Sequence, residues 1–284
     1  MYQCTMVKWE NTKKVDYMRK YIFAICVGIV VMCLCVGCNK NKKRKGDVDL
    51  PQLIIGSDNY DPYYFINEQG KTVGIDVELA REACRRIGYK PVFKKIVWDN
   101  KDIELEAGNI DCIWGSYTMT GRENEYQWAG PYMYSHQVIV VSAESNIKTI
   151  AGLKDKKIAV QVTGKPEEIF LKRLDNRIPE VEDVYSFSDI KEVFACLREG
   201  YVDAIAGHES TLNKLIDENN GDYYVLDENL YVSELGVAFL NNYKNKELIN
   251  KLSDTLEDMR KDGTIEKILD KYDISPQEAY IDRE

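Results

Sequence analysis

Short apolar strands alternate with amphipathic helices through most of this chain, and this alternation limits the folds open to it. Residues 53–56 form an apolar run that predicts a buried strand. Residues 75–87 place Leu79 and Ile87 on one face, which predicts an amphipathic helix. A further strand is predicted at 110–114. Strands that alternate with helices favour right-handed crossovers, and therefore an α/β fold with a mostly parallel sheet.

The same alternation recurs in the second part of the chain. A strand is predicted at 158–160, a helix opens at Pro166, and another strand is predicted at 204–206. Leucines at four-residue spacing predict a helix over 246–259, and a last helix is predicted around 265–269. Two small α/β lobes account for this order better than one continuous sheet, and 284 residues suffice for two modest domains.

The loop that follows the strand at 110–114 is dense in hydrogen-bond donors. Ser116 and Thr118 carry hydroxyls, Gly115 offers a backbone amide, and Arg122 carries a guanidinium. Such a set suits a small carboxylate or another planar oxyanion, and it suits binding better than bond breaking. In the alternative interpretation the segment is a strand-end turn whose hydroxyls bond to its own backbone.

Three further loops follow predicted strands. In open α/β sheets, ligands collect beyond the carboxyl ends of the strands, where loops and helix N-termini present unpaired amides. This rule singles out residues 57–65, 162–166 and 207–210. In the second of these loops, Pro166 suits the first position of a helix and leaves the preceding amides directed at an anion. A plain turn is the alternative for that loop.

An uncharged, largely apolar stretch near the start predicts export. Residues 21–37 carry no charge and follow Arg19 and Lys20, which is the order of a positive region and an apolar region in a signal sequence. Met18 is then an alternative start to Met1. The competing interpretation is a transmembrane helix of about the minimum spanning length. In both cases the bulk of the chain lies outside the cytoplasm.

The end of this stretch, residues 34–38, resembles a bacterial lipobox, in which the Cys after a small residue is lipidated. Cys38 is then the membrane anchor, although Cys35 stands where Leu is usual. These features predict a signal sequence over 1–37 and a lipidated basic tether over 38–50. The protein is therefore expected at the outer face of the cell membrane.

Charge and cysteine content exclude several functions. The formal net charge is −9 overall and −12 from Cys38 onward, because residues 1–37 carry five Lys or Arg against two acids; this argues against nucleic acid as a partner. Cys84 and Cys196 fall on apolar faces of predicted helices and Cys112 falls in a strand, so we expect buried free thiols. No metal or nucleotide motif has the required spacing, and we expect neither a metal nor a cofactor.

Seven segments in a fixed order resemble one family. They are IGSDNYDPYYF, VGIDVELAREACRRIG, IDCIWGSYTMTGR, WAGPY, KIAVQVTGKPEE, LREGYVDAIAGHES, and LGVAFLNN with RKDGTIEKILDKY downstream. Each is moderately specific, and their order is a strong signal. The chain from the first of these segments onward resembles the extracytoplasmic substrate-binding proteins of ABC importers for polar amino acids, family 3, which have the periplasmic-binding-protein type II fold.

The resemblance implies a clamp of two α/β lobes, each a mixed, mostly parallel sheet flanked by helices. Residues 51–141 and 234–284 would form the first, discontinuous lobe, and 142–233 the second, with hinge crossings between them. Closure over a small polar ligand, an amino acid, would create the surface read by an ABC permease with its ATPase. We expect a monomer with no chemistry of its own.

The resemblance also assigns ligand contacts by position. Tyr60 resembles the aromatic residue that stacks on the ligand side chain, while Gly115 and Thr118 resemble contacts to its α-amino and carboxylate groups. Thr163 and Gly164 would add donors from the second lobe. The expected ligand-binding residues are Asp58, Tyr60, Tyr64, Trp98, Gly115, Ser116, Thr118, Arg122, Thr163, Gly164, His208 and Glu209.

Two positions depart from the family pattern. The carboxylate-binding Arg usually lies three residues after the Thr at position 120, but here Arg122 comes two residues after it, with Glu123 in the expected place. The acidic residue that pairs with the ligand ammonium is replaced by His208, with Glu209 next to it. Either Glu209 substitutes for that acid, or the ligand is not an ordinary α-amino acid.

Two functions of other classes stay open. An enzyme on the same fold, similar to cyclohexadienyl dehydratase, would use His208 or Glu209 as its acid or base. A ligand-sensing lipoprotein would pass ligand occupancy to a membrane partner. The chain has two His residues and no Ser/His/Asp order, which favours binding. Adjacent permease and ATPase genes would favour import over sensing, and an adjacent sensor kinase gene would favour sensing.

Overall fold

The structure is a computed structural model that describes residues 50–219 and 221–279. The predicted signal sequence, the predicted lipidation site Cys38 and nearly all of the predicted tether lie outside the described residues. Within them, no helix is both long enough and apolar enough to cross a membrane.

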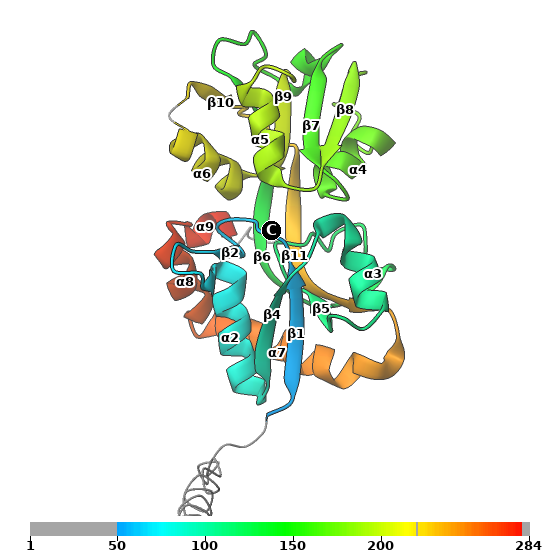
Figure 1. Cartoon of the computed structure of the whole chain (residues 1–284), viewed down its shortest axis with the longest axis vertical. Coiled ribbons are helices and arrows are strands. Elements are labelled where there is room, and N and C mark those ends of the chain that lie inside the picture. Colours follow the sequence, from blue (N-terminus) through cyan, green and yellow to red (C-terminus); the bar gives the residue numbers. More distant parts are fainter. Residues whose placement is uncertain (1–49, 220, 280–284) are drawn as a thin grey trace, which may run out of the picture. The chain divides into compact units, whose positions relative to one another are not determined.

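Strands and helices alternate as the sequence predicts, and the α/β fold class is confirmed (Figure 1). The strands are β1 (Gln52–Ser57), β2 (Phe65–Ile66), β3 (Thr72–Val73), β4 (Lys90–Lys95), β5 (Cys112–Ile113), β6 (Tyr126–Ser142), β7 (Lys157–Gln161), β8 (Asp183–Phe187), β9 (Ala204–His208), β10 (Tyr223–Val225) and β11 (Tyr231–Leu240). The α-helices are α2 (Ile75–Ile87), α3 (Lys101–Glu106), α4 (Lys165–Lys172), α5 (Ile190–Arg198), α6 (Glu209–Asn219), α7 (Lys246–Lys261), α8 (Thr264–Leu269) and α9 (Pro276–Ala279).

The main sheet has the strand order β4-β1-β5-β11-β6-β9-β7-β8, with β10 paired to β6. β1 is parallel to β4 and β5, and β7 is parallel to β8 and β9. We call β1, β4 and β5 with α2, α3, α7 and α8 the first half, and β7 to β10 with α4 to α6 the second half. β6 and β11 run through both halves and are antiparallel to each other and to their neighbours (Figure 1).

Because of these two long strands, one hydrogen-bonded sheet replaces the two separate sheets expected from the sequence. The 17 residues of β6 pair with β11 in their first part and with β9 and β10 in their last part. No strand was predicted over 126–142, and the two ends of β6 pack in different halves. The lobe boundaries at 51–141, 142–233 and 234–284 stay predictions.

The predicted helix faces are buried as expected. In α2, Leu79, Ala83 and Ile87 face the core, and Gly88 ends the helix in the left-handed conformation with φ 78°. Cys84 and Cys112 are buried free thiols, as predicted. Cys196 is also free but is partly exposed, because it lies at the edge of the buried face of α5.

The two halves are joined by apolar contacts in addition to the sheet. The largest cluster of buried apolar side chains contains Tyr60 and Tyr63 from the loop after β1 together with Ile190 of α5 and Leu212 of α6. Burial of such surface is the main favourable term in folding. The loop after β1 is therefore held against the second half, which brings the predicted ligand loops together.

Candidate ligand-binding site

A cavity of about 30 Å³, which we call the small cavity, lies where the two halves meet. Nine of the twelve expected residues line it: Asp58, Tyr60, Trp98, Gly115, Ser116, Thr118, Arg122, Gly164 and His208. Unexpected lining residues are Tyr117, Gln137, Gln161, Lys165, Pro166, Ala206 and Gly207. A volume of this size holds about one or two water molecules. An amino acid therefore requires the halves or their side chains to move apart.

Two of the three remaining expected residues, Tyr64 and Thr163, do not line the small cavity. Tyr64 is buried and its ring packs against Phe93, with 6.2 Å between ring centroids. Thr163 has φ 54°, and its hydroxyl accepts a hydrogen bond from Lys101 Nζ at 2.9 Å. Its amide donates to Glu167 Oε2 at 2.6 Å, so neither polar group of Thr163 is directed to the small cavity.

The loop after β5 forms the wall that belongs to the first half. The Ser116 amide donates to Asp76 Oδ2 at 2.6 Å, and the Thr118 hydroxyl donates to Ser233 Oγ at 3.0 Å. At Gly115 a Cβ atom would lie 1.9 Å from Ser57 Oγ, so any larger residue would displace that side chain. The loop is therefore fixed by contacts with other elements, rather than by bonds to its own backbone alone.

Arg122 lines the small cavity although it comes one residue earlier than the family pattern. Its side chain is buried, and its guanidinium lies 5.0 Å from the centroid of the Tyr117 ring. Nη1 donates to the Thr118 carbonyl at 3.1 Å, and Nη2 donates to the Thr163 carbonyl at 3.3 Å. Nη2 also lies 3.4 Å from Glu168 Oε2. Arg122 thus joins the two halves and places a buried cation at the small cavity.

Asp58 is the carboxylate of the small cavity. Gln161 Nε2, at the end of β7, donates to Asp58 Oδ2 at 2.6 Å and so connects the halves. Burial raises the pKa of Asp58 to about 7, because an apolar environment disfavours the charged form. Among the described residues, no group of three or more His, Cys, Asp or Glu residues is arranged to hold a metal ion.

His208 is buried at the end of β9 and carries no charge near neutral pH. Burial lowers its pKa to about 3. Ring Nε2 lies 3.0 Å from Gln137 Nε2, and ring Nδ1 lies 2.9 Å from Ser135 Oγ. Because the Gln137 amide nitrogen can only donate, ring Nε2 accepts and Nδ1 carries the proton. Neither ring nitrogen is left for a ligand ammonium.

Glu209 does not line the small cavity. It opens α6, and its carboxylate lies 3.2 Å from His136 Nδ1, on a different cavity. The change from strand to helix sends the side chains of His208 and Glu209 in different directions. In this arrangement Glu209 does not take the place of the missing acid.

His208 predicts a pH dependence of stability. Its folded pKa of about 3 lies below the ordinary value of 6.5, so the unfolded state takes up the proton first as pH falls. Stability is then lost below pH 6.5, by roughly 1.4 kcal/mol for each pH unit. Asp58 and Asp76 act oppositely, because their pKa values are raised to about 7 and their contribution falls as pH rises from 3.8.

Comparison with His208→Gln isolates this effect. The difference in unfolding free energy between the wild type and this variant should change by about 2 kcal/mol between pH 7 and pH 5. Urea denaturation at the two pH values measures it. A difference that is equal at both pH values would contradict the buried neutral imidazole.

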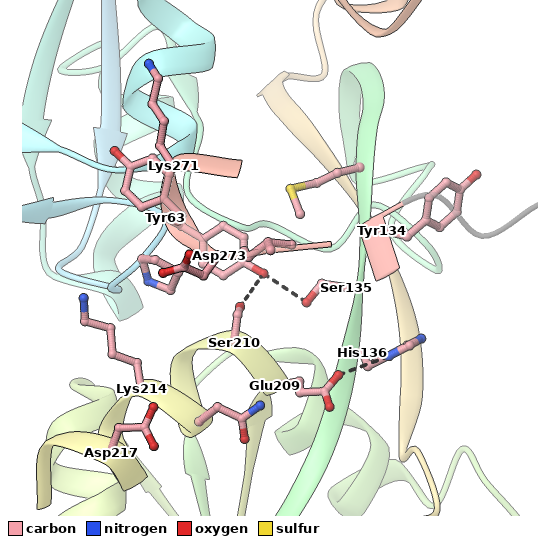
Figure 2. Close-up of a pocket in the computed structure, with 15 residues that line it drawn as sticks. Tyr63, Tyr134, Ser135, His136, Glu209, Ser210, Lys214, Asp217, Lys271 and Asp273 are labelled. Carbon is pink, nitrogen blue, oxygen red and sulfur yellow. Dashed lines mark hydrogen bonds and ion pairs between the residues drawn. The ribbon is translucent and has the colours of Figure 1, made fainter. Parts of the chain in front are cut away.

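A larger cavity of about 430 Å³ lies on the other side of a polar wall (Figure 2). Figure 2 shows Tyr63 between Ser135 and Ser210, and Glu209 facing His136. The Ser135 hydroxyl contacts both Tyr63 and His208 and so separates the two cavities.

The two lysines of the larger cavity are paired with residues outside it. Lys214 Nζ lies 3.0 Å from Asp61 Oδ1, and Lys271 pairs with Glu78. The small cavity is lined by the buried Arg122 and by Trp98 and Gln137, whose Nε1 and Oε1 have no partner among the described residues, and it lies at the predicted strand ends. We therefore place the candidate ligand-binding site in the small cavity.

A mixed sheet in two halves, with a cavity lined from both, is an arrangement suited to binding a small solute. The sequence profile of the bacterial extracellular solute-binding proteins, family 3, matches residues 53–274. The chain belongs to this family, as the order of its sequence motifs predicts.

Three similar proteins illustrate the family. The histidine-binding periplasmic protein of Salmonella typhimurium is 31% identical over 234 residues, which cover 78% of this chain and 88% of that protein. The structure of an ancestral arginine-binding protein bound to arginine has a TM-score of 0.70 and 30% identity, covering 78% of this chain and 98% of the other. An ancestral amino acid-binding protein, a precursor of cyclohexadienyl dehydratase, has a TM-score of 0.68 and 27% identity, covering 78% and 95%.

Proposed function

We propose that this protein captures an amino acid in the small cavity and delivers it to the permease of an ABC importer. The observation that carries the proposal is the buried Arg122 at a cavity shared by both halves. A guanidinium offers a planar fork of donors that matches a carboxylate. The histidine-binding and arginine-binding relatives support an amino acid as the ligand.

Entry of the ligand requires the halves to separate. Gln161 Nε2 bonds to Asp58 across the interface at 2.6 Å, and Arg122 bonds to the Thr163 carbonyl at 3.3 Å. These bonds break in an open form, which frees Arg122 for the ligand carboxylate. β6 and β11 run through both halves, so we assign the hinge to these two strands. The hinge then joins the lobe formed by 51–141 and 234–284 to the lobe formed by 142–233. The ligand must bind the closed form more tightly.

We assign the protein to the outer face of the cell membrane. The lipobox-like residues 34–38 support a lipid anchor on Cys38, and the composition of residues 38–50 supports a basic tether. Tethering keeps the binding protein close to the permease and its ATPase, and it requires no second copy of this chain. We therefore propose a monomer.

The site favours binding over the dehydratase-like enzyme. His208 has a pKa of about 3, and both of its ring nitrogens are engaged, so it is a poor acid or base near neutral pH. Glu209 lies at the larger cavity. Product formation from prephenate or arogenate by the wild type, with loss in His208→Ala, would overturn the non-enzymatic proposal.

A ligand panel tests the binding function. Ligand-free protein should be melted with each of the twenty amino acids, L-cystine, amines and small carboxylates. An amino acid at about 100 times its Kd stabilises the folded form by about 2.7 kcal/mol. That raises Tm by roughly 5 to 10 °C for a chain of this size. If no amino acid raises Tm, the proposed function is contradicted.

A further inference from the structure

Gln137 is a buried side chain of the small cavity to which the proposed function gives no role. It lies on β6, is 1% exposed, and lines the small cavity. Its Nε2 donates to Ser233 Oγ at 3.1 Å and to His208 Nε2 at 3.0 Å. Its Oε1 is buried and has no hydrogen-bond partner among the described residues.

The orientation of this amide and the tautomer of His208 belong together. When Gln137 Nε2 donates to Ser233 Oγ and to His208 Nε2, the imidazole proton lies on Nδ1, and Oε1 has no partner among the described residues. A buried carbonyl oxygen costs free energy until a donor reaches it. A donor on the ligand would remove this cost.

Hydrogen bonds connect Gln137 to the loop that carries Arg122. Ser233 Oγ accepts from both Thr118 Oγ1 at 3.0 Å and Gln137 Nε2 at 3.1 Å. The Thr118 carbonyl in turn accepts from Arg122 at 3.1 Å. A short hydrogen-bonded chain thus connects the Arg122 cation to Gln137, which carries an acceptor oxygen, and both residues line the small cavity. The carboxylate and ammonium of an α-amino acid are attached to one carbon and require such a pair.

We propose that Gln137 Oε1 accepts a hydrogen bond from the α-ammonium group of the ligand. This inference rests on the proposed function and adds the chemistry by which the ligand-binding site recognises its ligand. The ammonium group of an α-amino acid is bound by a neutral amide, and His208 holds that amide in place. The neutral acceptor selects for a hydrogen-bond donor beside the carboxylate. A carboxylate that lacks the amine leaves Oε1 unpaired and binds more weakly.

Gln127 supplies a matched control. It is a glutamine of the same strand, and its Oε1 is also buried without a partner, but it does not line the small cavity. Gln137→Met and Gln127→Met remove the same acceptor at the two positions. Gln137→Glu keeps an acceptor oxygen at the site and serves as the conservative variant.

The test compares an amino acid with its des-amino analogue by isothermal titration calorimetry. The first probes are L-histidine with imidazolepropionate and L-arginine with 5-guanidinopentanoate, followed by the amino acid of the panel with the largest Tm rise and its des-amino form. Gln137→Met should weaken amino acid binding at least about tenfold, and should change des-amino binding less than about twofold. Gln127→Met should change neither, and Gln137→Glu should retain the preference for the amine.

Three results would overturn the inference. Gln137→Met could weaken both members of a pair equally, as a purely structural role predicts, or it could leave both unchanged. The preference for the amine could instead be lost in Asp58→Asn and kept in Gln137→Met, which would assign the ammonium to Asp58. If no amino acid binds the wild type, the proposed function fails and this inference with it. If one binds and Gln137→Met keeps the preference, the inference alone fails.

Discussion

Arg122→Ala should weaken amino acid binding by about 100-fold or more. The side chain is buried at the small cavity, where a charge-assisted pair with a carboxylate is little screened by water. Truncating one partner of a buried charge pair costs roughly 2 to 5 kcal/mol, and each 1.4 kcal/mol is about tenfold in affinity. Isothermal titration calorimetry with the amino acid that gives the largest Tm rise measures the loss.

Two variants control this prediction. Arg122→Lys keeps the charge but loses the planar fork, so we expect an intermediate loss of affinity. Arg198→Ala removes an exposed Arg that contacts Glu199 and Asn219 away from the small cavity, and it should leave affinity unchanged. Glu168 keeps Lys165 and Lys172 as partners when Arg122 is removed, so the fold should persist. Unchanged affinity in Arg122→Ala would mean that the ligand is held elsewhere.

Gly74→Ala should lower the free energy of unfolding by about 3 to 5 kcal/mol. Gly74 precedes α2 with φ 131°, a conformation that side chains rarely adopt. An added Cβ would lie 2.2 Å from the Tyr63 carbonyl oxygen and 2.9 Å from that of Pro62. Backbone strain and steric overlap each cost about 1 to 3 kcal/mol. Urea denaturation followed by circular dichroism measures the change.

Gly70→Ala separates the stability cost of the backbone conformation from the stability cost of close atomic contact. Gly70 also has positive φ, 70°, but an added Cβ would have nothing within 4 Å. The left-handed conformation alone costs roughly 1 to 2 kcal/mol. If both variants lose equal stability, the close approach of the loop after β1 to the start of α2 is not as described. That loop contains Tyr60 and Tyr63, so Gly74 also supports the polar wall between the cavities.

The fold was predictable for those helices and strands in which apolar residues repeat with a single period. The helix over 75–87 coincides with α2, because its apolar face repeats with the helical period and a glycine follows it. The single sheet was not predictable from such periods. In β6 the Gly130-Pro131 pair interrupts the alternation, and the two ends of the strand are buried by different halves. Only the assembled sheet identifies them as one strand.

The candidate site was predictable from loops and less so from strands. Residues at the ends of β1, β5 and β9 were expected at the cavity, and Asp58, Thr118 and His208 line it. Gln137 and Gln161 were missed because both lie in strands and contact residues far away in the chain. A polar amide within an otherwise apolar strand was the available signal.

The sequence pattern also could not distinguish the positions of two neighbouring residues at a junction between a strand and a helix. His208 ends β9 and Glu209 begins α6, and the two side chains lie at different cavities. The choice between them depends on the direction of the backbone where the strand becomes a helix. Residue spacing does not define that direction.

A crystal structure with the amino acid that gives the largest Tm rise tests the central claim most directly. We predict that the ligand lies in the small cavity, enlarged around it, with its carboxylate on Arg122 and its ammonium at Gln137. A ligand bound in the larger cavity, between Tyr63 and Glu209, with Arg122 still on the Thr163 carbonyl and free of ligand, would contradict the account.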